Sequence, residues 1–217
     1  MNVTIIGGGN VGGAIAFSLI YSPEIKDICI TDKDKEKERA LVMDLEDAAW
    51  ITGKHVTSIK PEYSDYTIIT AGKNQIPGQQ RKELYDTNYP VIDSIVKRLS
   101  KRDGKVIIVT NPVQAITEAI SRKYSELEYI KLNTEIDTVR LHLLTGGVGE
   151  VSGSHDDCQR VIINGKESKH ISAAIRNKAE KIISGKGFTC YGIAAVVRRI
   201  IEDNETGKQT RNNEYHV

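Results

Sequence analysis

The sequence is poor in cysteine, in net charge and in long apolar runs, and each shortage excludes a class of protein. Cys29, Cys158 and Cys190 have no metal-ligand spacing and cannot all pair, so we expect reduced thiols and no metal site. With 30 Lys and Arg against 29 Asp and Glu, the net charge is +1, which argues against nucleic-acid binding. The longest apolar stretch, residues 12–20, is too short to span a bilayer, and the start resembles no signal peptide. We expect a cytoplasmic protein without membrane partners.

Residues 1–132 alternate between strand and helix patterns. The apolar runs predict strands at 2–6, 27–31, 55–59, 66–70 and 105–110, and the intervening periodicity predicts helices at 11–21, 33–48, 88–99 and 113–122. Strands separated by helices are typical of βαβ units, which build a parallel sheet. This part of the chain is therefore predicted to be an α/β domain.

Residues 133–217 are less regular and predict a small, shortened, mainly helical lobe. A strand at 129–132 should lead into it, with helices at 137–144, 171–183 and 189–201, a glycine-rich loop at 146–149 and a strand at 160–163. Asn164-Gly165 favours a tight turn after that strand. We place the domain boundary between residues 132 and 133.

A glycine motif directly follows the first predicted strand. Residues 7–12 fit G-x-G-x-x-G, and they open the first predicted helix. The glycines allow a tight turn and close approach of a pyrophosphate, while the helix start offers free N–H groups; this predicts cofactor contacts from Gly7, Gly9, Asn10, Val11 and Gly12. The fold expected is a Rossmann-type parallel sheet with helices on both faces. A glycine run can also serve an ordinary strand-to-helix turn.

Asp32 stands twenty positions after Gly12, at the end of the second predicted strand. A carboxylate there would accept hydrogen bonds from the adenosine ribose and repel a 2′-phosphate, which favours NAD over NADP. The alternative is that Asp32 caps the helix over residues 33–48.

Taken together, these segments resemble the lactate/malate dehydrogenase family, with NAD-dependent L-lactate dehydrogenases as the most similar members and a shortened substrate lobe. The likeness is carried in order by residues 7–12 with Asp32, 71–81 (AGKNQIPGQQR), 110–113 (TNPV), 136–140 (IDTVR) and 186–194 (KGFTCYGIA). It implies reversible hydride transfer between a nicotinamide and a small 2-oxo acid, within carboxylic acid metabolism. It also implies a homo-oligomer, a dimer or a tetramer.

The resemblance also implies a set of catalytic residues. His155, in GSHDDC (residues 153–158), would be the proton donor, because histidine titrates near neutrality. Asp137 would orient the imidazole, and Arg140, on the same helix face, would bind the substrate carboxylate. Arg81, after a Pro-Gly loop, would polarise the carbonyl as a lid closes. The alternatives are a solvated loop histidine, a surface Asp137–Arg140 pair and a solvated loop arginine.

Further contacts follow from the same resemblance. Cofactor contacts are expected from Ala71, Gly72, Asn88, Val109 and Asn111, and substrate contacts from Gln75, Asn111 and Thr189. Gln75 would face the substituent on C3 of the oxo acid. Because a neutral amide cannot pair with a second carboxylate, Gln75 favours pyruvate over oxaloacetate as the substrate. The alternative is that Gln75 is simply a polar residue of the lid.

Two departures from the family pattern keep other functions open. Asp156 replaces the glycine after the catalytic histidine, and the interval from Arg140 to His155 is short. The alternatives are malate/oxaloacetate specificity, or a nucleotide-binding module that has lost turnover.

Overall fold

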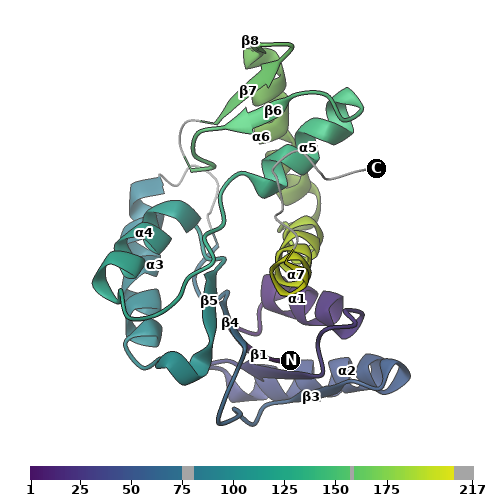
Figure 1. Cartoon of the computed structure of the whole chain (residues 1–217), viewed down its shortest axis with the longest axis vertical. Coiled ribbons are helices and arrows are strands. Elements are labelled where there is room, and N and C mark those ends of the chain that lie inside the picture. Colours follow the sequence, from purple (N-terminus) through teal and green to yellow (C-terminus); the bar gives the residue numbers. More distant parts are fainter. Residues whose placement is uncertain (75–80, 157–158, 208–217) are drawn as a thin grey trace. The chain divides into compact units, whose positions relative to one another are not determined.

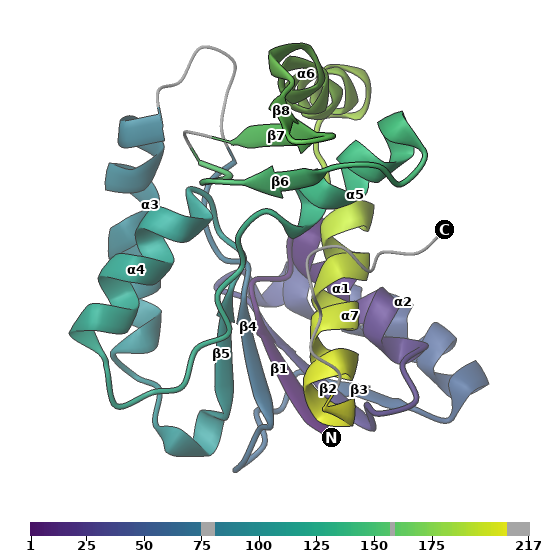
Figure 2. The ribbon, with the colours of Figure 1, turned by 45° about the horizontal axis from the view of Figure 1, so that its top comes forward.

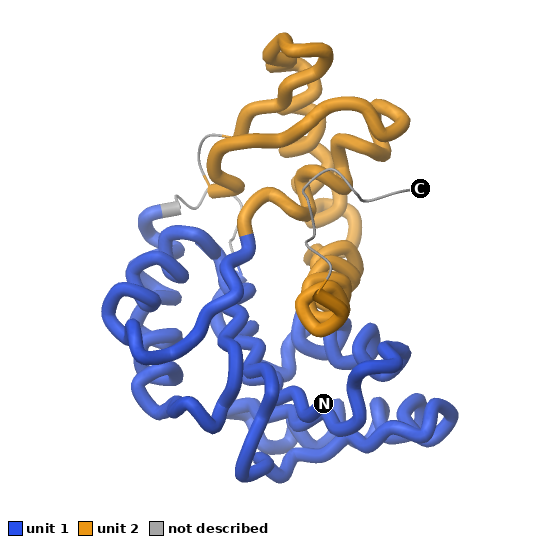
Figure 3. Tube along the Cα trace, viewed as in Figure 1, with its two compact units in different colours: residues 1–132 blue, residues 133–217 orange. Residues whose placement is uncertain are grey.

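The computed structural model describes residues 1–74, 81–156 and 159–207. The chain divides into two compact units, residues 1–132 and residues 133–217 (Figure 3). Within the described residues, no helix combines the length and apolar character that crossing a bilayer requires.

The first unit is built on a five-stranded parallel sheet. Its strands are β1 (Asn2–Ile6), β2 (Asp27–Thr31), β3 (His55–Thr57), β4 (Tyr66–Ile69) and β5 (Lys105–Ile108). They lie in the order β3-β2-β1-β4-β5, so the direction of winding reverses next to β1. This is the Rossmann strand order 3-2-1-4-5-6 up to its fifth strand, and the predicted Rossmann-type fold is confirmed.

Helices cover both faces of this sheet. They are α1 (Asn10–Ile20), α2 (Lys35–Thr52), α3 (Arg81–Val96) and α4 (Val113–Lys123), with a short 3-10 turn η1 (Lys101–Asp103) before β5. Figures 1 and 2 show α1 and α2 on one face and α3 and α4 on the other. The strands are buried on both sides, which explains why they read as continuous Ile and Val runs.

Branched aliphatic side chains form the core between the sheet and α3 and α4. The cluster comprises Ile69, Ile92, Ile95, Val96, Val106, Ile108, Ile116, Ile120 and Leu127. Each such side chain contributes about 1.5–3 kcal/mol when it is fully buried. The core holds the carboxyl ends of the strands in place, and ligands bind at these ends in open α/β folds.

The second unit packs helices α5 (Glu135–Thr145) and α6 (Lys169–Lys186) against a small antiparallel sheet, and α7 (Tyr191–Thr206) packs against α5. The strands of the sheet are β6 (Glu150–Ser152), β7 (Arg160–Ile163) and β8 (Lys166–Glu167). Leu141, Val151, Val161 and Ile175 join α5, the sheet and α6 in one cluster. The unit is mainly helical, as predicted.

Several predicted elements need correction. The strand expected at 129–132 is wrong: Tyr129 makes one isolated bridge with Val106, because the backbone bonds at this point are limited to those of Val106 with Glu128 and Ile130 within the described chain. The third helix starts at Arg81 rather than at residue 88. Its first turn is mostly polar, but Leu84 in that turn is buried and anchors it. The strands β6 and β8 were not predicted, and both form only by pairing with β7.

Candidate active site

The glycine turn after β1 is shaped by close backbone contacts. Gly7 has φ +116°, and a Cβ there would lie 2.6 Å from the Ala71 amide nitrogen. A Cβ on Gly12 would lie 1.9 Å from the Gly7 carbonyl oxygen, whereas one on Gly9 would meet no described atom within 4 Å. Gly7 and Gly12 are therefore required by packing. Gly9 instead leaves open space at the start of α1.

That open space faces unsatisfied helix donors. Gly9 precedes α1, and no side chain among the residues that the structure describes caps the helix. The first N–H groups of an uncapped helix carry a partial positive charge and bind phosphate well. The turn thus has the shape and the polarity that a dinucleotide pyrophosphate needs.

Asp32 joins β2 to the glycine turn. Its Oδ2 accepts a hydrogen bond from the Gly8 amide at 2.6 Å, and its Oδ1 accepts one from the Asp34 amide at 3.0 Å. The helix-cap alternative is wrong, because Asp34 caps α2 by accepting from the amides of Glu36 and Lys37. Asp32 therefore holds its carboxylate at the turn itself.

Asn88 connects the ends of β4 and β5. Its Oδ1 accepts from the Lys73 amide at 2.8 Å, and its Nδ2 donates to the carbonyls of Lys73 and Asn111. Gly72 lies beside it, where a Cβ would come within 2.5 Å of Thr110 Cγ2. The fully buried Asn88 thus ties together the backbone that follows β4 and β5.

The other predicted cofactor residues line the same strand ends. The Ala71 carbonyl accepts from the Thr110 hydroxyl at 2.8 Å, and the Val109 amide donates to Ile69 at 2.9 Å. Asn111 is exposed directly after β5, before a cis peptide bond to Pro112. These residues lie at the carboxyl ends of the strands, next to the glycine turn.

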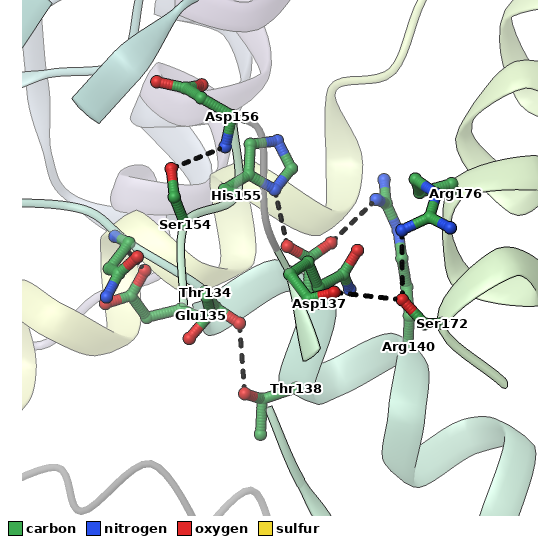
Figure 4. A network of polar contacts seen from close by, with 12 residues as sticks. Thr134, Glu135, Asp137, Thr138, Arg140, Ser154, His155, Asp156, Ser172 and Arg176 are labelled. Carbon is green, nitrogen blue, oxygen red and sulfur yellow. Dashed lines mark hydrogen bonds and ion pairs between the residues drawn. The ribbon is translucent and has the colours of Figure 1, made fainter. Parts of the chain in front are cut away.

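In the second unit, His155 and Asp137 meet. His155 Nδ1 lies 2.6 Å from Asp137 Oδ2 (Figure 4), and the Asp137 side chain is 2% exposed. Asp137 comes from α5, and His155 from the segment after β6. The contact fixes the ring through one nitrogen, so Nε2 can carry the proton that a reaction exchanges.

Arg140 contacts the other oxygen of the same carboxylate. Its Nη1 donates to Asp137 Oδ1 at 3.3 Å. Both residues are buried, so the surface-pair alternative is wrong. Burial lowers the pKa of Arg140, and the nearby Asp137 carboxylate opposes that shift. Among described residues Asp137 is the one acceptor for Arg140, which leaves guanidinium N–H groups for a ligand carboxylate.

Polar contacts that the sequence did not reveal surround this pair. The Asp156 amide donates to Ser154 Oγ at 3.1 Å, and the Asp156 residue is buried. From α6, Arg176 donates to Ser172 Oγ, which in turn donates to the Gln159 carbonyl (Figure 4). Ser172 and Arg176 carry no motif, so only the fold could identify them.

Not all predicted residues are placed. Gln75 lies outside the described residues, and for Arg81 the structure describes only that α3 begins there. Thr189 stands between α6 and α7, and its hydroxyl makes no hydrogen bond within the described part of the chain. The roles of these three residues remain predictions.

The structure also describes two buried cysteines and a buried histidine that the predicted site does not include. Burial, followed by the charge of Glu38, raises the pKa of the Cys29 thiol to about 11. Cys190 is also buried and free, and Cys158 lies outside the described residues. His142 is buried at the wall of an open pocket of about 310 Å³ between the glycine-rich loop and the β7–β8 turn.

Comparison with known proteins agrees with these observations. Residues 1–132 match the family model described as lactate/malate dehydrogenase, NAD binding domain. The chain is 32% identical to L-lactate dehydrogenase 2 of Lactiplantibacillus plantarum, over 91% of this chain and 75% of that protein. It is 31% identical to a probable L-lactate dehydrogenase of Schizosaccharomyces pombe, over 93% of this chain and 72% of that protein.

Solved structures show the same fold. A lactate dehydrogenase from a Medee basin deep-sea metagenome library superposes with a TM-score of 0.77 and 24% identity, over 92% of this chain and 76% of that one. Malate dehydrogenase from Archaeoglobus fulgidus, in complex with NADH, gives a TM-score of 0.78 and 24% identity, over 94% and 77%.

Proposed function

The chain belongs to the lactate/malate dehydrogenase family, and we propose that it transfers a hydride between NADH and a small 2-oxo acid, with pyruvate and L-lactate as the preferred pair. The observation that carries this proposal is the buried carboxylate of Asp137, which holds His155 with one oxygen and Arg140 with the other. A proton donor and a carboxylate-binding cation thus share one anchor.

The first unit supports NAD as the cofactor. The open space at Gly9 would take the pyrophosphate, and Asp32 beside Gly8 would accept hydrogen bonds from the adenosine ribose hydroxyls. The same carboxylate would repel the 2′-phosphate of NADP. We also propose a cytoplasmic location, because the buried thiols of Cys29 and Cys190 are free.

The residues divide the chemistry among them. When bound, NADH supplies the hydride to C2 of the oxo acid. His155 gives its proton to the carbonyl oxygen, so that a hydroxyl forms, and Asp137 stabilises the imidazolium before that transfer. Arg140 binds the carboxylate with its remaining N–H groups and so orients C2. Arg81 would polarise the carbonyl from the start of α3, and Asn111 and Thr189 would contact the substrate.

Turnover is tested by following NADH absorbance with pyruvate and with oxaloacetate. We expect a higher kcat/KM for pyruvate, because Gln75 offers no charge to a second carboxylate. Gln75→Arg should shift the preference toward oxaloacetate. A preference of the unmodified protein for oxaloacetate would assign it to malate chemistry. NADH binding without turnover of either acid would leave only a nucleotide-binding module.

We propose that the protein forms a homo-oligomer through α2. Met43, Trp50 and Ile51 of this helix are exposed, Trp50 to 88%, and exposed apolar side chains gathered on one helix are typical of interfaces. Sedimentation of Trp50→Glu should show monomers, while Ile59→Glu, outside the helix, should sediment like the unmodified protein. A monomeric unmodified protein would exclude the proposal.

A further inference from the structure

Lys186 lies between two aromatic rings at the end of α6. Its Nζ is 4.0 Å from the centroid of the Tyr191 ring and 4.6 Å from that of Phe188. It also lies 3.7 Å from Cys190 Sγ. Within the described residues no carboxylate pairs with Lys186, so the two rings are the main partners of its charge.

The two rings belong to residues on either side of Thr189 in the chain. The chain leaves α6 through Gly187, at φ +87°, and re-enters a helix at Tyr191. Within the described residues, backbone bonds hold the ends of this connection: the Gly187 amide donates to Ile183, and the Ala194 amide to Cys190. The Thr189 hydroxyl makes no hydrogen bond to those residues, so no such bond fixes its direction there.

We propose that Lys186 is a positioning residue for the oxo acid. Its ammonium contacts the rings of Phe188 and Tyr191, on either side of Thr189 in the chain, and thereby restrains the segment that carries the Thr189 hydroxyl. The inference rests on the proposed function, because it takes Thr189 as a substrate contact. Lys186 itself does not touch the substrate.

The proposed role of Lys186 depends on its charge, and suitable variants separate the effect of that charge from the effect of side-chain packing. Arginine also binds aromatic faces, whereas methionine keeps an apolar stem without a charge. Losing two exposed cation–π contacts corresponds to a change of about 5–30-fold in a binding constant. Lys186→Met should therefore raise the KM for pyruvate by about that factor, with kcat and NADH affinity nearly unchanged. Lys186→Arg should stay within about twofold of the unmodified enzyme.

The experiment combines this kinetic comparison with hydrogen exchange of residues 187–190. Exchange should rise in Lys186→Met and not in Lys186→Arg, while Lys181→Met, an exposed lysine of the same helix, should change neither readout. Equal KM values in the Met and Arg variants overturn the proposal. Faster exchange in Lys186→Met, combined with no turnover in the unmodified protein, overturns the proposed function instead and reduces Lys186 to a structural clamp.

Discussion

The imidazole of His155 and the carboxylate of Asp137 meet at 2.6 Å, although eighteen residues separate them along the chain. Asp137 is held on a buried helix face, and His155 belongs to a connecting segment. A ring bound at Nδ1 by a carboxylate keeps one tautomer and one orientation. The pair thus has the geometry of a proton donor with its orienting partner.

Removing either partner should slow catalysis without releasing the cofactor. His155→Ala should lower kcat by about 10²–10⁴-fold, because the proton donor is lost. Asp137→Asn should lower it by at least about 10²-fold, because an amide cannot stabilise the imidazolium and favours the wrong tautomer.

Stopped-flow turnover and NADH fluorescence titration measure the two effects separately. His142→Ala, which changes a histidine outside the pair, is the matched control and should retain kcat when folded. Unchanged kcat in His155→Ala would remove this residue from the mechanism.

Two glycines of the same turn should respond differently to one added methyl group. Gly9→Ala meets open space and should cost at most about 1 kcal/mol of stability, as expected for alanine before a helix. Its methyl group would stand where the pyrophosphate approaches, so NADH affinity should fall by about tenfold or more.

Gly12→Ala is the contrasting variant. Its Cβ would lie 1.9 Å from a backbone oxygen, so it should cost about 1–3 kcal/mol or more in the unfolding free energy. Urea unfolding and NADH titration of both variants test the pair. Full NADH affinity in Gly9→Ala would mean that the pyrophosphate binds elsewhere.

The parts of the fold that the sequence predicts well are those set by local chemistry. The strands β1 and β2 have the predicted bounds because buried Ile and Val runs end at the glycine turn and at Asp32. Asn164 and Gly165 both adopt positive φ, as a two-residue hairpin turn requires. The strand β6 was missed because its three residues bury only Val151, and pairing with β7 is what orders them.

The site was predictable where spacing decides geometry. Asp137 and Arg140 are three apart on a helix, so their contact could be inferred. Their burial could not, because it depends on the packing of α5 against α6 and α7. Two other sets of contacts could not be predicted from spacing either. Ser172 donates to the Gln159 carbonyl across two elements, and Lys186 reaches its aromatic partners because the chain reverses after α6.

Asp103 should make stability depend on pH. Burial alone would raise the pKa of this carboxyl, but hydrogen bonds from Lys60 and Ser100 outweigh that effect and lower the pKa below its ordinary value. A folded-state pKa below the unfolded value means that the stabilisation is complete above the unfolded pKa. It disappears as the pH falls through the folded value.

Asp103→Asn should therefore lower the unfolding free energy by about 1–3 kcal/mol at pH 7, and by less near pH 3. Denaturant unfolding at both pH values measures this. Glu62→Gln breaks the exposed pair with Arg102 and is the control, expected to change stability by less than about 1 kcal/mol. A difference that grows toward acid pH would contradict the assigned sign.

Asp32 and Asp34 stand two residues apart, and their carboxylates have different hydrogen-bond partners. Asp32 binds the Gly8 amide at the cofactor turn, whereas Asp34 caps α2. Asp32→Ser should weaken NADH binding by about 10–100-fold, since hydrogen bonds from a carboxylate to the ribose are lost, and NADPH binding should improve relative to NADH. Asp34→Ser keeps a capping hydroxyl and should leave the ratio of NADH to NADPH affinity unchanged.

Titration of both variants with both cofactors measures these affinity ratios. Equal affinity of the unmodified protein for NADH and NADPH would show that Asp32 does not read the ribose, and a ratio altered only in Asp34→Ser would move that role to the helix cap.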